Sequence, residues 1–432
     1  MKRIKITLIG FAAVSAIMLP LLSSTRQSVA NAKPKGCVFK TIFGEEETLD
    51  SAFFFKTPEK VESSLDKALA FIMKAQQNNG GWGAGLSSKQ NILDPHAVKT
   101  DPATTAMVLM SLLRTGNTLQ KGAYSTQVST GLEYLLKSVE SSDPNSSTIT
   151  KETGTQIQAK LGYNIDVVLT AQLLSNMVEY VEHDPALKKR VTDNPQVCVN
   201  KIQKTQSGNG SFSGGSWAGV LQSSFASSAL ESAYEQGIKV DTVVLKKSQQ
   251  YQTSNYDVKT GMVDASDGAS IVLYSVSSTV RNTSVNAKKV KKDLEKAEKE
   301  GKISSKDTVV TAETLQKIGY TSTEAQQYST SYNVYNSAKK TAQQDNVMKG
   351  FGNNGGEEYL SFLQTGESMI INKDSDWKKW YDNISGQILS YQNNDGSWNG
   401  HHCITSPVFC TATAMLILSV NNDVERLAKM GK

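Results

Sequence analysis

After its first 22 residues, the sequence lacks any apolar stretch long and uncharged enough to cross a membrane, which takes about 20 residues. The net charge is only +5 over 432 residues, and no concentrated basic face with aromatic or motif support occurs, which argues against nucleic-acid binding. Strand patterns are scarce, and neither a βαβ alternation nor a glycine-rich phosphate loop is present. The chain is therefore predicted to be mostly helical.

The one long apolar stretch, at the N-terminus, has the features of a secretory signal. Lys2, Arg3 and Lys5 form a positively charged region, residues 6–22 are apolar, and the small residues 30–32 suit cleavage. We therefore expect residues 1–32 to be a signal peptide and the mature protein to be exported to a periplasmic or extracellular location, with no membrane span left after cleavage. An uncleaved N-terminal anchor is the alternative.

Cysteine is rare, and its even number matters if the chain is exported. Four cysteines in an oxidising compartment predict two disulfides, for which three pairings exist. We expect Cys403 to pair with Cys410, because the two lie close together in the sequence. Cys37 would then join the N-terminal segment to Cys198.

A repeated pattern dominates what the sequence does contain. It consists of an Ile, a Gln four residues later, a Gly four after that, and a Trp or Phe two further on. Such self-similarity indicates a repeat architecture. The three copies are Ile72/Gln76/Gly80/Trp82, Ile202/Gln206/Gly210/Phe212 and Ile388/Gln392/Gly396/Trp398.

Helical patterns alternate in pairs along residues 61–421. An amphipathic helix is followed each time by a more uniformly apolar one, about six times over, which predicts two concentric rings of helices. The apolar members are expected near 103–114, 163–181, 223–236, 267–281, 357–371 and 407–420.

Three segments lie outside this pattern. Residues 33–60 form an N-terminal extension and residues 422–432 a C-terminal tail. Residues 283–347 are rich in Lys, Glu, Ser and Gln, and their opposite charges at i,i+4 spacing predict a solvated helical insertion. A partner-binding arm is the alternative interpretation of this insertion.

The repeats followed by apolar helices resemble the QW repeats of the terpenoid cyclase/protein prenyltransferase superfamily, in particular its squalene-cyclase-like and prenyltransferase-like bacterial members. The resemblance covers residues 61–421 and implies an all-α (α/α)6 toroid. It also implies that each repeat Gln ties a helix end while the aromatic ring stacks beside it. The residues concerned are Gln76, Trp82, Gln206, Phe212, Gln392 and Trp398.

The catalytic motifs of this superfamily are missing from the sequence. Neither the Asp-x-Asp-Asp nor the Asp-Cys-Thr-Ala-Glu acid of the triterpene cyclases occurs, and neither does an Asp-Asp-x-x-Asp magnesium motif or a Gly-Cys-Gly-Glu-Gln thioester. Holding a carbocation also needs a cavity walled by aromatic rings. The predicted inner helices carry few of them, in keeping with an aromatic content of 7%.

The segment GHHCITSPVFC at 400–410 could hold zinc. His402, Cys403 and Cys410 with one carboxylate would make a tetrahedral set. Aligned on the last segment of the prenyltransferases, Cys410 stands where their zinc-binding His would be. Zinc ligation and a Cys403–Cys410 disulfide exclude each other, and export favours the disulfide.

Two further polar groups could form a catalytic site. Asp94 and His96 could act as a general-base couple, although Asp before Pro more often caps a helix, as Asp101 would. Glu357 and Glu358 could bind a cation or donate a proton, although Glu in a first helical turn also simply complements the helix dipole. All these residues lie in loops that lead into apolar helices, which a toroid gathers on one face.

The sequence thus predicts an exported toroid that serves as a non-catalytic binding or scaffold domain, with no cofactor and with a protein or a lipid-like ligand as partner. One alternative is an enzyme that acts on an isoprenoid or lipid-like substrate. A second is a zinc-dependent enzyme that uses residues 401–410.

Overall fold

The computed structural model describes residues 56–212, 215–304, 309–352 and 354–423. The predicted signal peptide, Cys37 and most of the N-terminal extension and of the C-terminal tail lie outside these residues. The described chain is all helical, and two isolated β-bridges are its only extended pairings. The prediction of an all-α fold is therefore confirmed for this part of the chain.

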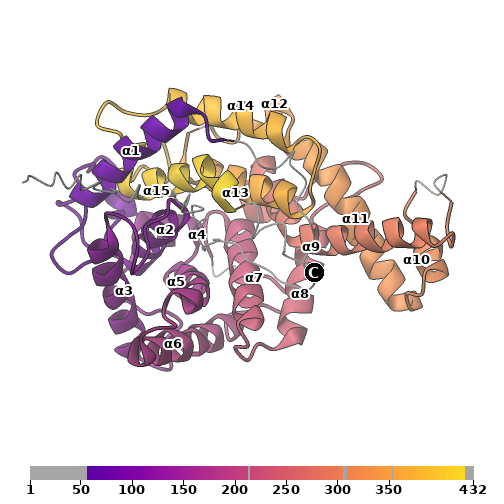
Figure 1. The fold of residues 1–432 in the computed structure, drawn as a ribbon, viewed down its shortest axis with the longest axis horizontal. Coiled ribbons are helices and arrows are strands. Elements are labelled where there is room, and N and C mark those ends of the chain that lie inside the picture. The colour runs from indigo at the N-terminus through magenta and orange to yellow at the C-terminus, as the bar shows by residue number, and fades with distance from the viewer. Residues whose placement is uncertain (1–55, 213–214, 305–308, 353, 424–432) are drawn as a thin grey trace, which may run out of the picture. The chain divides into compact units, whose positions relative to one another are not determined.

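Fifteen α-helices are labelled in chain order (Figure 1). They are α1 (Glu59–Lys74), α2 (Pro102–Arg114), α3 (Ser125–Glu140), α4 (Gln156–Leu161), α5 (Ile165–Met177), α6 (Pro185–Gln203), α7 (Gly219–Glu235), α8 (Thr242–Ser254), α9 (Val272–Lys299), α10 (Ala312–Lys317), α11 (Ser322–Ala342), α12 (Asp345–Met348), α13 (Gly356–Ile371), α14 (Trp377–Ser390) and α15 (Pro407–Leu418). Short 3-10 turns are interspersed at Ser87–Lys89, Val178–Tyr180, Ser266–Gly268 and Val420–Asp423.

Six of these helices pack in a closed cycle. The order is α2, α5, α7, α9, α13 and α15, and α15 returns to pack against α2. Every residue of α2, α5, α13 and α15 is buried, as are residues 273–284 of α9. These six helices, here called the inner helices, begin within a few residues of the six apolar segments expected from the sequence.

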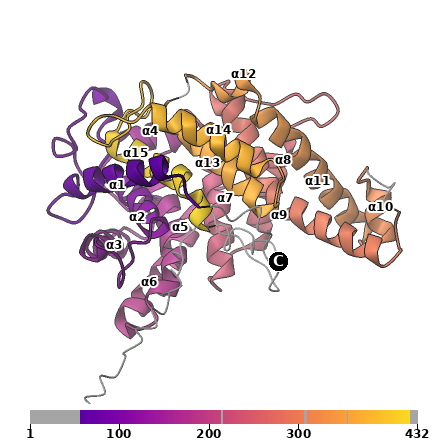
Figure 2. The same cartoon turned by 45° about the horizontal axis from the view of Figure 1, so that its top comes forward.

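An amphipathic helix covers each inner helix on the outside. In chain order these outer helices are α1, α3, α6, α8, α11 and α14, each packed against inner helices. In Figure 1, α1, α3 and α6 lie outside α15, α2 and α5, and Figure 2 again shows α3 and α6 outside α2 and α5. In α1 the buried side chains Val61, Leu65, Ala68 and Ile72 follow helical spacing, so one stripe meets the core and the rest faces solvent.

The repeat glutamines connect one outer helix to the next. Each side-chain amide donates to the carbonyl of the Gly four residues later and to a carbonyl of the following outer helix. The second acceptors are Gln127 on α3 (3.1 Å from Gln76), Val244 on α8 (2.8 Å from Gln206) and Ser64 on α1 (3.0 Å from Gln392). The last bond joins the final repeat to the first helix and closes the cycle.

The aromatic residue of each repeat fills the space behind this turn. The indole N–H groups of Trp82 and Trp398 donate to the carbonyls of Ile72 (2.9 Å) and Ile388 (2.7 Å). Both rings are fully buried. Phe212 has no such donor, and only its backbone N–H is tied, to Ser223 Oγ at 2.9 Å. The middle repeat therefore makes a weaker connection.

The repeat position needs glycine because the backbone there has a positive φ and because a neighbouring helix leaves no room for a side chain. Gly396 has a φ of +89°, and a Cβ there would lie 2.5 Å from the carbonyl oxygen of Lys67 on α1. A side chain would thus be strained and would push the two outer helices apart.

The charged segment does not form a separate unit. Helix α9 continues unbroken from the inner helices into it and packs along α11 (Figure 1). Val290, Val310, Leu315 and Ala325 form a small core of their own there. The segment therefore has a buried side as well as the solvated face expected from its charge pattern.

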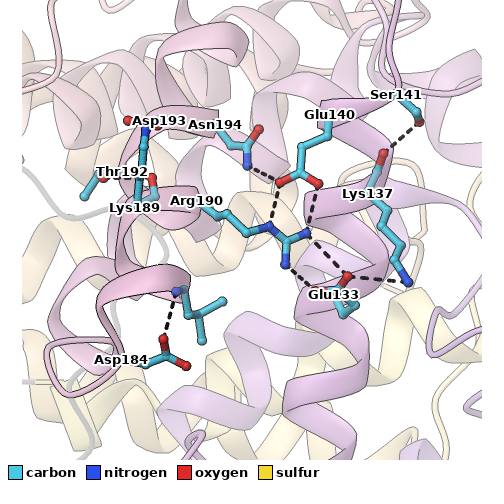
Figure 3. A network of polar contacts seen from close by, with 11 residues as sticks. Glu133, Lys137, Glu140, Ser141, Asp184, Lys189, Arg190, Thr192, Asp193 and Asn194 are labelled. Atoms are coloured by element: carbon cyan, nitrogen blue, oxygen red, sulfur yellow. Dashed lines mark hydrogen bonds and ion pairs between the residues drawn. The ribbon is translucent and has the colours of Figure 1, made fainter.

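A surface network links the outer helices α3 and α6 (Figure 3). Arg190 donates through Nε to Glu140 (2.7 Å) and through Nη1 to Glu133 (2.7 Å). These bonds with Arg190 lower the pKa of both carboxyls below their usual value. The side chains are about one third exposed, so solvent screens the network.

Replacing Arg190 by Ala is expected to reduce the free energy of unfolding by less than about 1 kcal/mol at neutral pH. The two lowered carboxyl pKa values stabilise the fold above the unfolded pKa, and this contribution is lost as pH falls through the folded pKa. Urea unfolding should thus show a difference between Arg190→Ala and the parent at pH 7 that shrinks at pH 3 and in high salt. A difference that persists at pH 3 would contradict an electrostatic origin.

Candidate functional site

The loops that lead into the inner helices gather on one face, here called the lead-in face. Backbone N–H groups of Ser87 and Ala218 donate to the carbonyls of Gly154 (2.9 Å) and Lys160 (2.8 Å), which joins the first three loops. The last loop is joined to the first, because Gln90 Nε2 donates to the carbonyl of Cys403 at 2.7 Å.

The acidic pair at 357–358 and the segment 400–410 meet on this face. The backbone N–H of His401 donates to the carbonyl of Asn354 at 3.2 Å. A Cβ on Gly355 would lie 2.7 Å from the His402 ring, and one on Gly356 would lie 2.7 Å from Ile404. These glycines allow the loop before α13 to lie against the segment before α15, so two of the three groups predicted from the sequence share one site.

Glu358 is a structural residue at the start of α13. One carboxylate oxygen accepts from the Tyr274 hydroxyl (2.6 Å) and from the backbone N–H of Phe351 (2.8 Å), and the other accepts from the N–H of Gly355 (3.1 Å). The bond from Gly355 is the glutamate half of a capping box, since Gly355 has no side chain to return a bond. The interpretation of this glutamate as a helix-start residue is supported, and the bond from α9 adds a tertiary role.

Glu357 has a different environment. It is fully buried, and its carboxylate oxygens make no well-formed hydrogen bond to another described residue. Burial raises its pKa to about 8 and the charge of Glu358 adds to the rise, whereas the backbone N–H groups of Glu357 itself and of Ile404, together with the charge of Lys160, oppose it. At neutral pH its carboxyl is therefore protonated, and it can donate a hydrogen bond or a proton.

His402 lies beside this pair as a neutral imidazole. Burial lowers its pKa, against the opposing charge of Glu358, whose carboxylate is 3.7 Å from Nε2. The ring meets Phe351 and His401 edge to face, with centroids 4.7 and 4.1 Å away. Neither ring nitrogen has a hydrogen-bond partner among the described residues. His402 can thus accept or donate a bond to an added group.

The predicted zinc set is not assembled. In the described part of the chain, no three or more His, Cys, Asp or Glu side chains are grouped so as to hold a metal ion. Burial raises the pKa of Cys403 to about 11 and raises that of Cys410 as well, which disfavours the thiolates that zinc needs. The zinc site of His402, Cys403 and Cys410 therefore stays a prediction that the described geometry does not support.

The expected Cys403–Cys410 disulfide is wrong for this structure, in which both cysteines are free thiols. Cys410 lies in the first turn of α15 and its Sγ donates to the carbonyl of Ile404 at 3.3 Å. Proximity in sequence did not bring the two sulfurs together, because the helix fixes one of them. Cys198 is a buried free thiol, and its predicted partner Cys37 lies outside the described residues.

Asp94 and His96 do not form a base couple. Asp94 accepts from the backbone N–H of His96 (2.9 Å), while the imidazole Nε2 lies 2.8 Å from the carbonyl of Lys74 at the end of α1. Both side chains are exposed, away from the acidic pair. Asp101 is a helix cap, as the alternative held, since its carboxylate accepts from the N–H of Thr104 at 2.7 Å.

Large apolar side chains surround the lead-in face. Each of the first five lead-in loops exposes at least one, and Trp217, Phe351 and Met262 are 43%, 54% and 69% exposed. Lys160 Nζ lies 4.6 Å above the Trp217 ring. This set, here called the apolar rim, consists of Leu86, Leu93, Tyr163, Trp217, Met262 and Phe351. Sequence reasoning did not single it out, although all its members lie in loops that precede inner helices.

Contacts between the inner helices include polar bonds. Ser224 on α7 donates to Gln364 on α13 (3.2 Å) and accepts from Asn282 on α9 (2.8 Å). Such neutral dipoles differ from the aromatic walls that a carbocation needs. The interior therefore gives no support to cation cyclisation.

No protein-family model, curated protein or solved structure matches this chain. Among its described helices, none combines the length and the apolar character that a membrane crossing requires.

Proposed function

We propose that this protein is an exported (α/α)6 toroid of the squalene-cyclase-like and prenyltransferase-like kind that acts as a non-catalytic binding protein. The closed cycle of inner helices and the Gln392–Ser64 connection support the toroid. The ligand is amphipathic and lipid-like: its apolar part contacts the apolar rim and its polar group reaches Glu357.

One observation carries this proposal, the buried carboxyl of Glu357. Buried polar groups in proteins are nearly always hydrogen-bonded, so a buried carboxyl with no well-formed bond at either oxygen can still take a bond from a ligand. Its protonated form is a donor that suits a neutral oxygen acceptor on a ligand. Because the apolar rim lies on the same lead-in face, a molecule with a polar head and an apolar body fits both features.

The binding role is tested by extracting the purified full-length protein with organic solvent and analysing the extract by mass spectrometry. A lipid-like molecule is expected in the parent and should be depleted in a Trp217→Ala/Phe351→Ala variant. Val243→Ala, which removes an exposed apolar side chain at the start of α8, is the matched control. An extract without lipid, or equal lipid in all three proteins, would rule out the proposal.

Glu357 and Glu358 should respond oppositely to replacement by Gln. The raised pKa of Glu357 means that the folded protein keeps a proton that the unfolded chain releases, so its contribution to stability is lost as pH rises from about 5 to about 8. Glu357→Gln should match the parent at pH 5 and be more stable than it at pH 8. Glu358→Gln should be less stable by about 1–3 kcal/mol, because it loses charge-assisted bonds to Tyr274 and the loop.

Urea unfolding of both variants from pH 5 to pH 8 measures this difference. Asp166 and Glu367 also have raised pKa values, but they are present in all three proteins and drop out of the comparison. If Glu357→Gln lost stability at pH 5 as Glu358→Gln does, Glu357 would be a structural residue and the ligand proposal would lose its support.

The second candidate is an enzyme in which Glu357 protonates an isoprenoid or lipid-like substrate. The observation in its favour is the same protonated acid, whose pKa of about 8 suits proton donation near neutral pH. Incubating the extracted molecule with fresh protein separates the two functions. A binding protein returns it unchanged, whereas an enzyme converts it and Glu357→Gln stops the conversion.

A further inference from the structure

A short motif occurs twice, on two consecutive outer helices. Helix α8 carries QQYQT at residues 249–253, and α11 carries QQYST at residues 326–330. On each helix four residues stand at positions i, i+3, i+4 and i+7. They are the residue three positions before the first Gln, the two Gln and the Thr. They therefore form one stripe along one side of the helix.

The two stripes face each other across a groove, here called the amide groove. It has a volume of about 920 Å³, within the range of small-molecule sites. Carboxamide and hydroxyl side chains make up most of its wall, and Lys246 and Glu313 are its only charged members. The residues that carry the argument are Gln249, Gln250, Thr253, Gln326, Gln327 and Thr330.

The base of the groove is fixed while its walls have free hydrogen-bonding groups. The hydroxyl of Tyr256, at the base, bonds to Ser337 (2.7 Å) and Thr341 (3.0 Å) of α11. The side-chain amides of Gln250, Gln326 and Gln327, by contrast, are in no hydrogen bond to another described residue. Each amide therefore keeps two donors and an acceptor for a ligand.

We propose that the amide groove binds a neutral oligosaccharide. A carboxamide can donate to one hydroxyl and accept from its neighbour, so paired glutamines on two walls match a chain of sugar hydroxyls. An anionic ligand would need an excess of positively charged side chains, whereas the charges of Lys246 and Glu313 cancel each other. A protein or peptide partner usually needs pockets lined by large apolar side chains for its anchoring residues, and among the lining residues only Ala312 and the ring of Tyr256 are apolar. The groove shares no residue with the apolar rim or with the acidic pair, so this proposal is independent of the proposed function.

Isothermal titration calorimetry on the full chain tests this site with maltohexaose, cellohexaose and chitohexaose as probes. At least one of them is expected to bind. Gln250→Ala/Gln327→Ala should weaken it about tenfold or more, because two hydrogen-bonding groups are lost. Asn383→Ala, which removes an exposed carboxamide on α14, should leave binding unchanged. Thermal unfolding of the double variant should match the parent, since neither Gln side chain bonds to the fold.

Three results would each overturn the site. The first is the absence of binding by all three neutral probes. The second is binding that the double variant retains in full. The third is preferential binding of hexagalacturonate or of a Ser- and Gly-rich peptide, which would indicate an anion or a polypeptide as the ligand class.

Discussion

Replacing Trp398 by Ala is expected to lower the free energy of unfolding by about 3–5 kcal/mol, the range found for buried large aromatic side chains. The ring is fully buried, and its N–H bond to Ile388 holds the turn that positions Gln392 against α1. The variant therefore opens a cavity where the last repeat meets the first helix. Since small proteins have only about 5–15 kcal/mol of stability, this loss is a large fraction of the total.

Urea unfolding followed by circular dichroism measures this effect, and Trp217→Ala is its matched control. Trp217 is 43% exposed, so its loss should cost far less. Trp398→Phe should fall between the parent and Trp398→Ala, because the middle repeat already carries Phe212 at this position. Equal destabilisation by Trp398→Ala and Trp217→Ala would show that the repeat aromatic does not hold the two ends together.

Arg114→Ala is the second large effect we expect, again a loss of about 3–5 kcal/mol. Arg114 ends α2 and is fully buried, and it donates to Glu367 on α13, to Asp423 (2.7 Å) and to the carbonyl of Leu416 (3.0 Å). Removing the guanidinium leaves two buried carboxylates without their cation, and burial already raises the pKa of Glu367 to about 7. The destabilisation should therefore grow as pH rises through neutrality.

A double variant separates charge from packing at this cluster. Arg114→Met/Glu367→Gln removes one charge of each sign and keeps most of the volume, so it should recover a good part of the loss. Lys99→Ala, which breaks the exposed pair with Glu152, should cost less than about 1 kcal/mol. If the surface variant lost as much stability as Arg114→Ala, burial of the cluster would not explain its effect.

The helices and their burial could be predicted because the relevant pattern is local. Stripes at helical spacing separate outer from inner helices, and the uniformly apolar segments coincide with α2, α5, α13 and α15. The repeat turns could be predicted for the same reason, since Gln76, Gly80 and Trp82 interact within ten residues of chain. The continuation of α9 beyond residue 281 was missed, because its charged exposed face concealed a buried stripe that includes Val290.

The candidate site was only partly predictable. The sequence placed Glu357, Glu358 and His402 in loops of the same kind, yet it assigned the two glutamates one common role. Adjacent residues on a helix point in different directions, and only tertiary contacts give Glu358 the Tyr274 hydroxyl while Glu357 makes no well-formed side-chain hydrogen bond. For the cysteines, short separation suggested a disulfide, whereas in the structure both are free thiols and Cys410 bonds to the carbonyl of Ile404.

The sequence by itself determined the all-helical fold, the alternation of inner and outer helices and the turns that end the repeats, because each depends on side chains within a few turns of one helix. The tertiary structure decided the closure through Gln392 and Ser64, the meeting of segments 350–358 and 400–404, and the facing of the two glutamine stripes. Those contacts join residues far apart in the chain, and their geometry depends on how every helix between them packs.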